Sequence, residues 1–185
     1  AAARVNLWKD VPGLLTSDPR IVPDARVLPQ LNLREAAELA YYGAKVLHPR
    51  ALIPIIGRKV PLFVRPFGDP AAEGTEVSER ATALDVPVKA LSSALGQALI
   101  TVEGNGMLGV PGVAARTFQA LQREEISVSL ITQASSEHSI CFCVPAPSAE
   151  RARACLAEAF RDEISHREID GVTVRPGVAT IAVVG

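Results

Sequence analysis

Two stretches of the sequence carry polar side chains suited to holding a charged small molecule. The first runs from Lys9 to Gly13 and is followed by Arg20, so that a cation and a carboxylate come directly after an apolar run and a turn signal. Lys9 and Arg20 suit phosphate oxygens, whereas Asp10 suits a ribose hydroxyl or an amine. The alternative is a structural loop in which Asp10 accepts hydrogen bonds from backbone N–H groups. Spacing alone leaves both interpretations open.

The second stretch combines the glycine-rich loop of residues 103–109 with the polar run of residues 133–138. Pro111 is typical of the first turn of a helix, and the N–H groups at a helix start attract carboxylates. Gln133 would then contact the ammonium group or the side chain of a free amino acid. Two alternatives stay open: a loop that only uses the backbone freedom of glycine, and a solvated hairpin connection.

The composition narrows the class of protein. The chain has 185 residues, is 48% hydrophobic and has a formal net charge of -1, which predicts a globular protein with a buried core. The near-neutral charge argues against a nucleic-acid surface, and no apolar run reaches the length of a membrane span. The first residues lack the pattern of a signal peptide, so we expect a cytoplasmic protein. We interpret the three cysteines as buried free thiols rather than metal ligands, and we expect no metal site.

The elements expected around the first stretch form the end of an α/β sheet. Asn32 and Glu35 have the spacing of a capping box at a helix start, and Gly43 is typical of a helix end. The predicted elements are a strand at 5–8, a helix at 32–43, a helical stretch at 48–57 and a strand at 60–64. Residues 68–87 are rich in Pro, Gly, Ala and charged residues, and we interpret them as a linker.

The elements expected around the second stretch are more regular. They are a strand at 99–102, a helix from Pro111, strands at 126–132 and 138–144, a helix at 148–164 capped by Ser148, and a strand at 172–174. The order β-α-β-β-α-β is that of the ferredoxin-like split unit. A further strand is predicted at 178–184. Gln133 then follows the second strand of this unit, at the end of the sheet where the first helix begins.

Four ordered segments of the sequence resemble aspartokinases. They are LWKDVPGLLTSDPR, EAAELAYYGAKVLHPRAL, EGNGMLGVPGVAARTFQAL and ISVSLITQASSEHSICFCVP. The resemblance implies an α/β (α+β) chain: residues 1–80 as the C-terminal part of an amino-acid-kinase domain, 81–89 as a linker, 90–177 as a ferredoxin-like regulatory ACT domain, and 178–185 as the first strand of a second ACT domain. The segment LITQASSEHSI resembles the threonine-sensitive members most, including those fused to homoserine dehydrogenase.

The same resemblance implies an activity and its binding residues. The activity is phosphorylation of L-aspartate by ATP with Mg²⁺, giving 4-phospho-L-aspartate, with feedback inhibition by threonine. The implied nucleotide-binding residues are Lys9, Asp10, Leu15, Arg20, Lys45 and Val46, of which Lys45 by itself is typical of a surface cation. The implied effector-binding residues are Met107, Val110, Gly112, Val113, Ala114, Ser129 and Gln133. Ser129 stands where lysine-sensitive members have an aspartate, which favours threonine over lysine. Leu15 stands where a nucleotide-contacting tyrosine is frequent.

The comparison with the family also shows differences. The segments Lys-Phe-Gly-Gly-Thr-Ser and Gly-Arg-Gly-Gly-Ser-Asp of the family have no counterpart here, so we expect a part of a longer enzyme that is inactive by itself. We expect a homo-oligomer through the ACT region, because the apolar strand at 178–184 needs a cover. The alternatives are an amino-acid-sensing module without catalysis, and another amino-acid kinase such as glutamate 5-kinase or a uridylate kinase.

Overall fold

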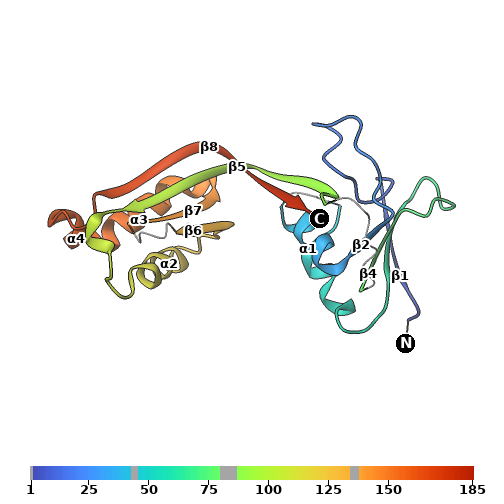
Figure 1. Cartoon of the computed structure of the whole chain (residues 1–185), viewed down its shortest axis with the longest axis horizontal. Helices are drawn as coiled ribbons and strands as arrows, with labels where there is room; N and C mark the ends of the chain where they lie inside the picture. The colour runs from blue at the N-terminus through green and yellow to red at the C-terminus, as the bar shows by residue number, and fades with distance from the viewer. Residues whose placement is uncertain (1, 43–45, 80–86, 134–137) are drawn as a thin grey trace. The chain divides into compact units, whose positions relative to one another are not determined.

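The computed structural model describes residues 2–42, 46–79, 87–133 and 138–185, and it divides into two compact units (Figure 1). The first unit comprises Ala1–Ala94 with Ile181–Gly185, and the second comprises Leu95–Thr180. Both dividing points fall inside long strands, β5 (Ala90–Glu103) and β8 (Gly171–Val184). The strands predicted at 172–174 and 178–184 are therefore one strand. Whether residues 178–185 open a second ACT domain stays a prediction.

The first unit is built on a four-stranded mixed sheet. Its strands, in spatial order, are β1 (Val5–Lys9), β3 (Leu62–Pro66), β4 (Thr75–Ser78) and β2 (Gln30–Asn32). The interpretation of residues 68–87 as a linker was wrong, because they contain β4, an inner strand on which Thr75 and Val77 are completely buried. Gly74, directly before β4, makes this segment resemble a linker in the sequence. The fold needs a glycine there, because its φ is +69° and a Cβ would overlap the carbonyl of Val64.

Helix α1 (Leu33–Tyr41) begins with the predicted capping box. The Glu35 N–H donates to Asn32 Oδ1, and the Asn32 N–H donates to Glu35 Oε2, both over 2.9 Å. The apolar side of α1 packs into the core of the first unit, and the predicted helix end at Gly43 lies outside the described residues. The helical stretch expected at 48–57 consists of two short 3-10 turns, η1 (Pro49–Ala51) and η2 (Ile53–Ile55).

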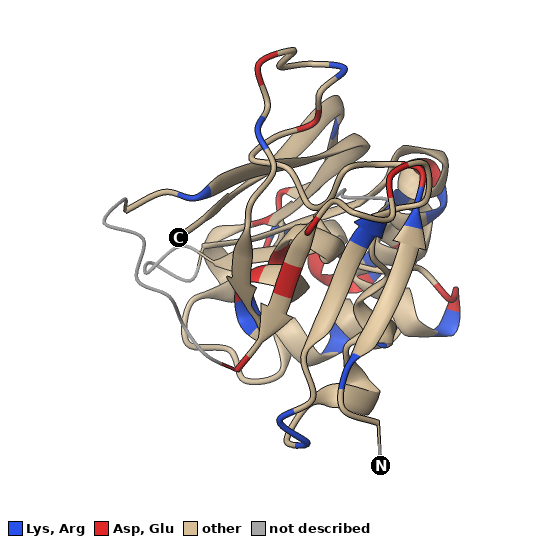
Figure 2. Cartoon of the chain, turned by 90° about the vertical axis from the view of Figure 1, so that its right-hand side faces the viewer, with Lys and Arg blue, Asp and Glu red and all other residues tan. Residues whose placement is uncertain are grey.

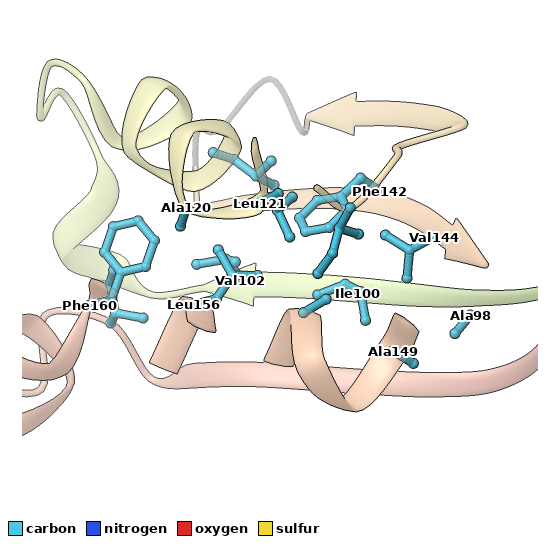
Figure 3. Packing of buried hydrophobic residues seen from close by; sticks show 14 of the residues in the cluster. Ala98, Ile100, Val102, Ala120, Leu121, Phe142, Val144, Ala149, Leu156 and Phe160 are labelled. Atoms are coloured by element: carbon cyan, nitrogen blue, oxygen red, sulfur yellow. The ribbon is translucent and has the colours of Figure 1, made fainter. Parts of the chain in front are cut away.

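The second unit confirms the ferredoxin-like order. Its sheet has the spatial order β6-β7-β5-β8, with β6 at Leu130–Gln133 and β7 at Ser139–Pro145. The helices are α2 (Val113–Arg123), α3 (Ala149–Ala159) and α4 (Arg161–Ser165). Alternate residues of β5 and β7 point to the helices and form a core with them, seen in Figure 3: Ala98, Ile100, Val102, Phe142, Val144, Leu121, Leu156 and Phe160.

Several predicted boundaries of the second unit shift for local reasons. Helix α2 begins at Val113 rather than Pro111, because Gly112 has φ +91°, outside the helical region. Ser148 precedes α3 as expected, but its side chain makes no capping hydrogen bond. The helix predicted at 148–164 is interrupted at the buried Phe160, which separates α3 from α4. The strand predicted at 126–132 starts only at Leu130.

The remaining side chains of note lie scattered over both units. All three cysteines are free, but only Cys143 is buried; Cys141 and Cys155 are partly exposed, so their predicted burial was wrong. Acidic and basic positions are interspersed along the ribbon (Figure 2). Across the described residues, no helix is long and apolar enough to cross a membrane.

Candidate functional site

A cavity of about 450 Å³ opens in the first unit, at the carboxyl end of β1. Its lining comes from the end of β1 and the following loop, from α1, and from the start of β5: Lys9, Asp10, Val11, Leu14, Leu15, Ser17, Asp18, Pro19, Arg20, Leu39, Val46, Leu91, Ser92 and Ser93. This volume is in the range of small-molecule sites. Five of the six predicted nucleotide-binding residues therefore lie around one cavity, whereas Lys45 lies outside the described residues.

The loop after β1 is held by buried contacts rather than solvated. The Leu14 N–H donates to the hydroxyl of Thr75 over 2.8 Å, and the Leu28 N–H donates to the Leu14 carbonyl over 2.8 Å. Leu14 itself is buried, and a Cβ at Gly13 would lie 2.7 Å from the Thr75 hydroxyl. The loop is thus anchored to β4, the strand that the sequence did not reveal, and this anchoring fixes the cavity wall.

Arg20 is oriented by a carboxylate of the same loop. Its Nε donates to Asp18 Oδ1 over 3.0 Å, and its Nη2 donates to Asp18 Oδ2 over 2.6 Å. The hydrogen bond to Asp18 raises the pKa of Arg20, so the guanidinium stays charged. The lining includes two cations, Lys9 and Arg20, and two carboxylates, Asp10 and Asp18, whose formal charges cancel. A polyphosphate bound here would need additional positive charge.

The predicted effector residues lie in the second unit, most of them at one end of its sheet. Ile140 of β7 pairs with Val102 of β5 and with Gln133 of β6, so Gln133 lies at the sheet end where β5 finishes. The chain after β5 passes through the 3-10 turn η3 (Asn105–Met107) into α2. The segment that leaves this end of the sheet carries five more of the predicted effector residues: Met107, Val110, Gly112, Val113 and Ala114. The side chain of Met107 is buried in the core of the second unit.

Ser129 lies apart from the other predicted effector residues. Its N–H donates to the Cys143 carbonyl over 2.9 Å, and its hydroxyl donates to Gln97 Oε1 over 3.0 Å. It precedes Gln133 by four residues, which at a strand rise of 3.3 Å per residue is roughly 13 Å. Ser129 thus lies toward the opposite end of β6, and its contact with an effector stays a prediction.

The glycines of the loop divide into two kinds. A Cβ at Gly104 or Gly106 would come within about 2.6 Å of the Glu168 carbonyl oxygen, and the Gly106 N–H donates to that oxygen over 2.8 Å. These two glycines fit the structural interpretation of the loop. Gly109 and Gly112 instead have φ of +67° and +91°, and no heavy atom outside the neighbouring residues lies within 4 Å of either Cβ position. Beside Gly112 there is therefore room for a ligand to approach the start of α2.

Comparisons with known proteins match both units. Residues 1–66 match the amino acid kinase family, and residues 100–160 match an ACT domain. Over its whole length the chain is 42% identical to the bifunctional aspartokinase/homoserine dehydrogenase of Haemophilus influenzae and 37% identical to lysine-sensitive aspartokinase 3 of Escherichia coli, covering 23% and 40% of those proteins. The chain belongs to the aspartokinase family. It spans less than half of the length of these relatives.

Solved aspartokinases share the fold. E. coli aspartokinase III in complex with lysine and aspartate, described as its T-state, has a TM-score of 0.79 at 35% identity, with 98% of this chain and 39% of that chain covered. The same E. coli enzyme in complex with aspartate and ADP, described as its R-state, has a TM-score of 0.78 at 34% identity, covering 98% of this chain and 40% of that one. Both solved structures match nearly the whole of this chain, so the two units together share the aspartokinase fold.

Outside the loop after β1, four residues line the cavity that the sequence did not predict for the site: Leu39, Leu91, Ser92 and Ser93. Leu39 lies one turn after Glu35 of the capping box, and its sequence context does not mark it as a site residue. Leu91, Ser92 and Ser93 come from the start of β5, about seventy residues after the loop that carries Arg20. The Ser92 hydroxyl donates to the Tyr42 carbonyl over 2.8 Å, which ties this strand to the end of α1. Local patterning contains no signal for such a long-range approach.

Proposed function

We propose that the protein carrying this chain is an aspartate kinase, which transfers the γ-phosphoryl group of ATP, in the presence of Mg²⁺, to the side-chain carboxylate of L-aspartate and forms 4-phospho-L-aspartate. The observation that supports this proposal is the cavity of the first unit, whose lining includes five of the six residues that the family resemblance predicts to bind the nucleotide. The complex of the E. coli relative with aspartate and ADP supports the same ligand classes.

In this proposal, different residues of the cavity contact different parts of the nucleotide. Lys9 and Arg20 neutralise phosphate oxygens, and Asp10 accepts a hydrogen bond from a ribose hydroxyl or an amine. Three apolar side chains provide a wall for the base: Leu15, Leu39 and Val46. Phosphoryl transfer depends on positioning and charge stabilisation rather than on a covalent intermediate. Because carboxylates offset the two cations, the Mg²⁺ that accompanies ATP supplies charge that these side chains do not.

The test is aspartate-dependent ATP turnover by the full-length protein. Because the exposed guanidinium is proposed to contact phosphate oxygens, Arg20→Met should raise the KM for ATP about tenfold. Arg161→Met is the matched control, because Arg161 is an exposed arginine paired with Glu158 in the second unit. Absence of aspartate-dependent turnover, or equal KM values for the two variants, would contradict the proposal.

We also propose that threonine inhibits this kinase through the second unit. The match to an ACT domain and the empty space beside Gly112 support an amino-acid site there. Ser129 is engaged with Gln97 and offers no carboxylate for a lysine ammonium. Calorimetry with L-threonine and with L-lysine on the full-length protein tests the choice. Binding of lysine alone would contradict it.

A second candidate is an amino-acid-sensing, self-associating module without catalysis. Strand β6 favours association, because it is an edge strand and all four of its residues are exposed. Ile181 and Val183 of β8 are exposed as well. Calorimetry with ATP separates the candidates, since only the kinase requires a nucleotide. Sedimentation of the full-length protein tests the homo-oligomer, for which a monomer at all concentrations would be the contrary result.

A further inference from the structure

An ion pair removed from solvent lies beside the cavity of the first unit. Lys89 Nζ is 2.7 Å from Glu35 Oε1, and each side chain is only 8% exposed. Taking two charges out of water carries a large desolvation cost, and an apolar pair of similar size is often no less stable. A pair of this kind is therefore better explained by the geometry it imposes than by the stability it adds.

The pair joins three segments of the first unit. The second carboxylate oxygen of Glu35 accepts the Asn32 N–H that caps α1, so the carboxylate cannot move without disturbing the helix start. The backbone N–H of Lys89 donates to the Val184 carbonyl over 2.7 Å at the end of β8. The start of α1, the residue before β5 and the end of β8 are thereby held at one point.

Two of these segments also form walls of the cavity. Leu39 lies one turn beyond Glu35 on α1, and the lining residues Leu91–Ser93 begin two positions after Lys89. The Leu91 N–H donates to the Thr16 carbonyl over 2.8 Å, which ties the strand to the loop carrying Arg20. A displacement of Lys89 relative to Glu35 would therefore move one wall of the cavity against the other.

We propose that Lys89 and Glu35 are positioning residues for the nucleotide cavity, and that their ion pair is the point at which strand β5 sets nucleotide affinity. Strand β5 continues without interruption from Ala90 to Glu103, where the loop toward the predicted effector residues begins. An effector that shifts this strand would change the cavity through the pair. This inference rests on the proposed nucleotide site and names the side chains that couple it to regulation.

The experiment compares variants of the full-length protein by KM for ATP, kcat, response to L-threonine and thermal unfolding. Lys89→Met should raise the KM for ATP about tenfold, with kcat changed less than twofold, and threonine should no longer change that KM although calorimetry still detects threonine binding. Lys89→Arg keeps the charge and should restore both properties. Arg153→Met is the matched control, because Arg153 pairs with Glu150 on the surface of α3, and it should behave as wild type.

A second variant guards against misfolding. Lys89→Met leaves the Glu35 charge buried and unpaired, whereas Glu35→Gln combined with Lys89→Met removes both charges and should fold with the same KM defect. A folded Lys89→Met protein with wild-type KM and threonine response would overturn the inference. The inference would also be overturned if both variants lost stability and showed a lower kcat together with a higher KM for ATP. A wild-type protein that binds no ATP would instead refute the proposed function, and the inference with it.

Discussion

Substitution of Gly112 by alanine separates the predicted effector site from the rest of the second unit. Gly112 has φ +91°, in the left-handed region, and nothing lies within 4 Å of its Cβ position. An L-residue in this region costs about 1–2 kcal/mol, without any added clash. The new methyl group would project into the space before α2, where the N–H groups of the first turn are predicted to receive the effector carboxylate.

The expected effect on inhibition follows from the contacts that are blocked. Hydrogen bonds to a charged group are worth about 1.5–3 kcal/mol, so losing one should raise the threonine concentration for half inhibition about ten- to a hundredfold. The assay is a threonine inhibition curve of the full-length kinase, with the uninhibited rate of each variant as its own reference. Thermal unfolding of the same samples reports the backbone strain separately.

Gly177→Ala is the matched control for this prediction. Gly177 lies on β8 in the same unit, has φ +68°, and also has nothing within 4 Å of its Cβ position. The two variants should lose about the same unfolding free energy, but only Gly112→Ala should lose sensitivity to threonine. Equal half-inhibition concentrations for the two would refute the placement of the carboxylate at the start of α2.

The remaining predictions concern Gln133 and Glu163. Gln133→Ala should raise the half-inhibition concentration of threonine on the order of ten- to a hundredfold, since a lost hydrogen bond to a charged group of the effector costs about 1.5–3 kcal/mol. The substitution Gln122→Ala, at another exposed glutamine, should not change it. Similar inhibition curves for the two variants would indicate that Gln133 belongs to a solvated loop. The hydrogen bond from Arg116 lowers the pKa of Glu163, so the stability from this pair is present above the ordinary carboxyl pKa and lost as the pH falls through the lowered one. Glu163→Gln should therefore cost about 0.2–1 kcal/mol near neutral pH and nothing in strong acid, by unfolding at both pH values; a pH-independent cost would contradict this.

Local signals predicted the elements whose stabilising partners are close in sequence. The capping box of α1 joins Asn32 to Glu35, three residues apart, and it forms as expected. The alternation of β7 places Ile140, Phe142 and Val144 in the core because successive strand residues point to opposite faces. The β-α-β-β-α-β order follows from such local periods. The family resemblance predicted six nucleotide-binding residues, five of which line one cavity in the structure.

Other features depend on contacts that local patterning does not contain. Residues 75–78 form strand β4 because Gly74 lets them approach β3 and because β2 pairs on their other side. Neither contact is visible in the local sequence pattern, which predicted a linker. Ser129 and Gln133 are four residues apart, yet strand geometry places them toward opposite ends of β6.

The Glu35–Lys89 pair joins residues 54 positions apart. Side chains at that separation meet only after the elements of the first unit have packed, and the burial that makes their charges consequential exists only in the folded chain. The sequence by itself therefore determined the class of each unit and the residue types at its sites. The tertiary structure decided which strand closes the cavity and which buried charges hold that strand, because burial and long-range pairing are properties of the packed chain rather than of any segment.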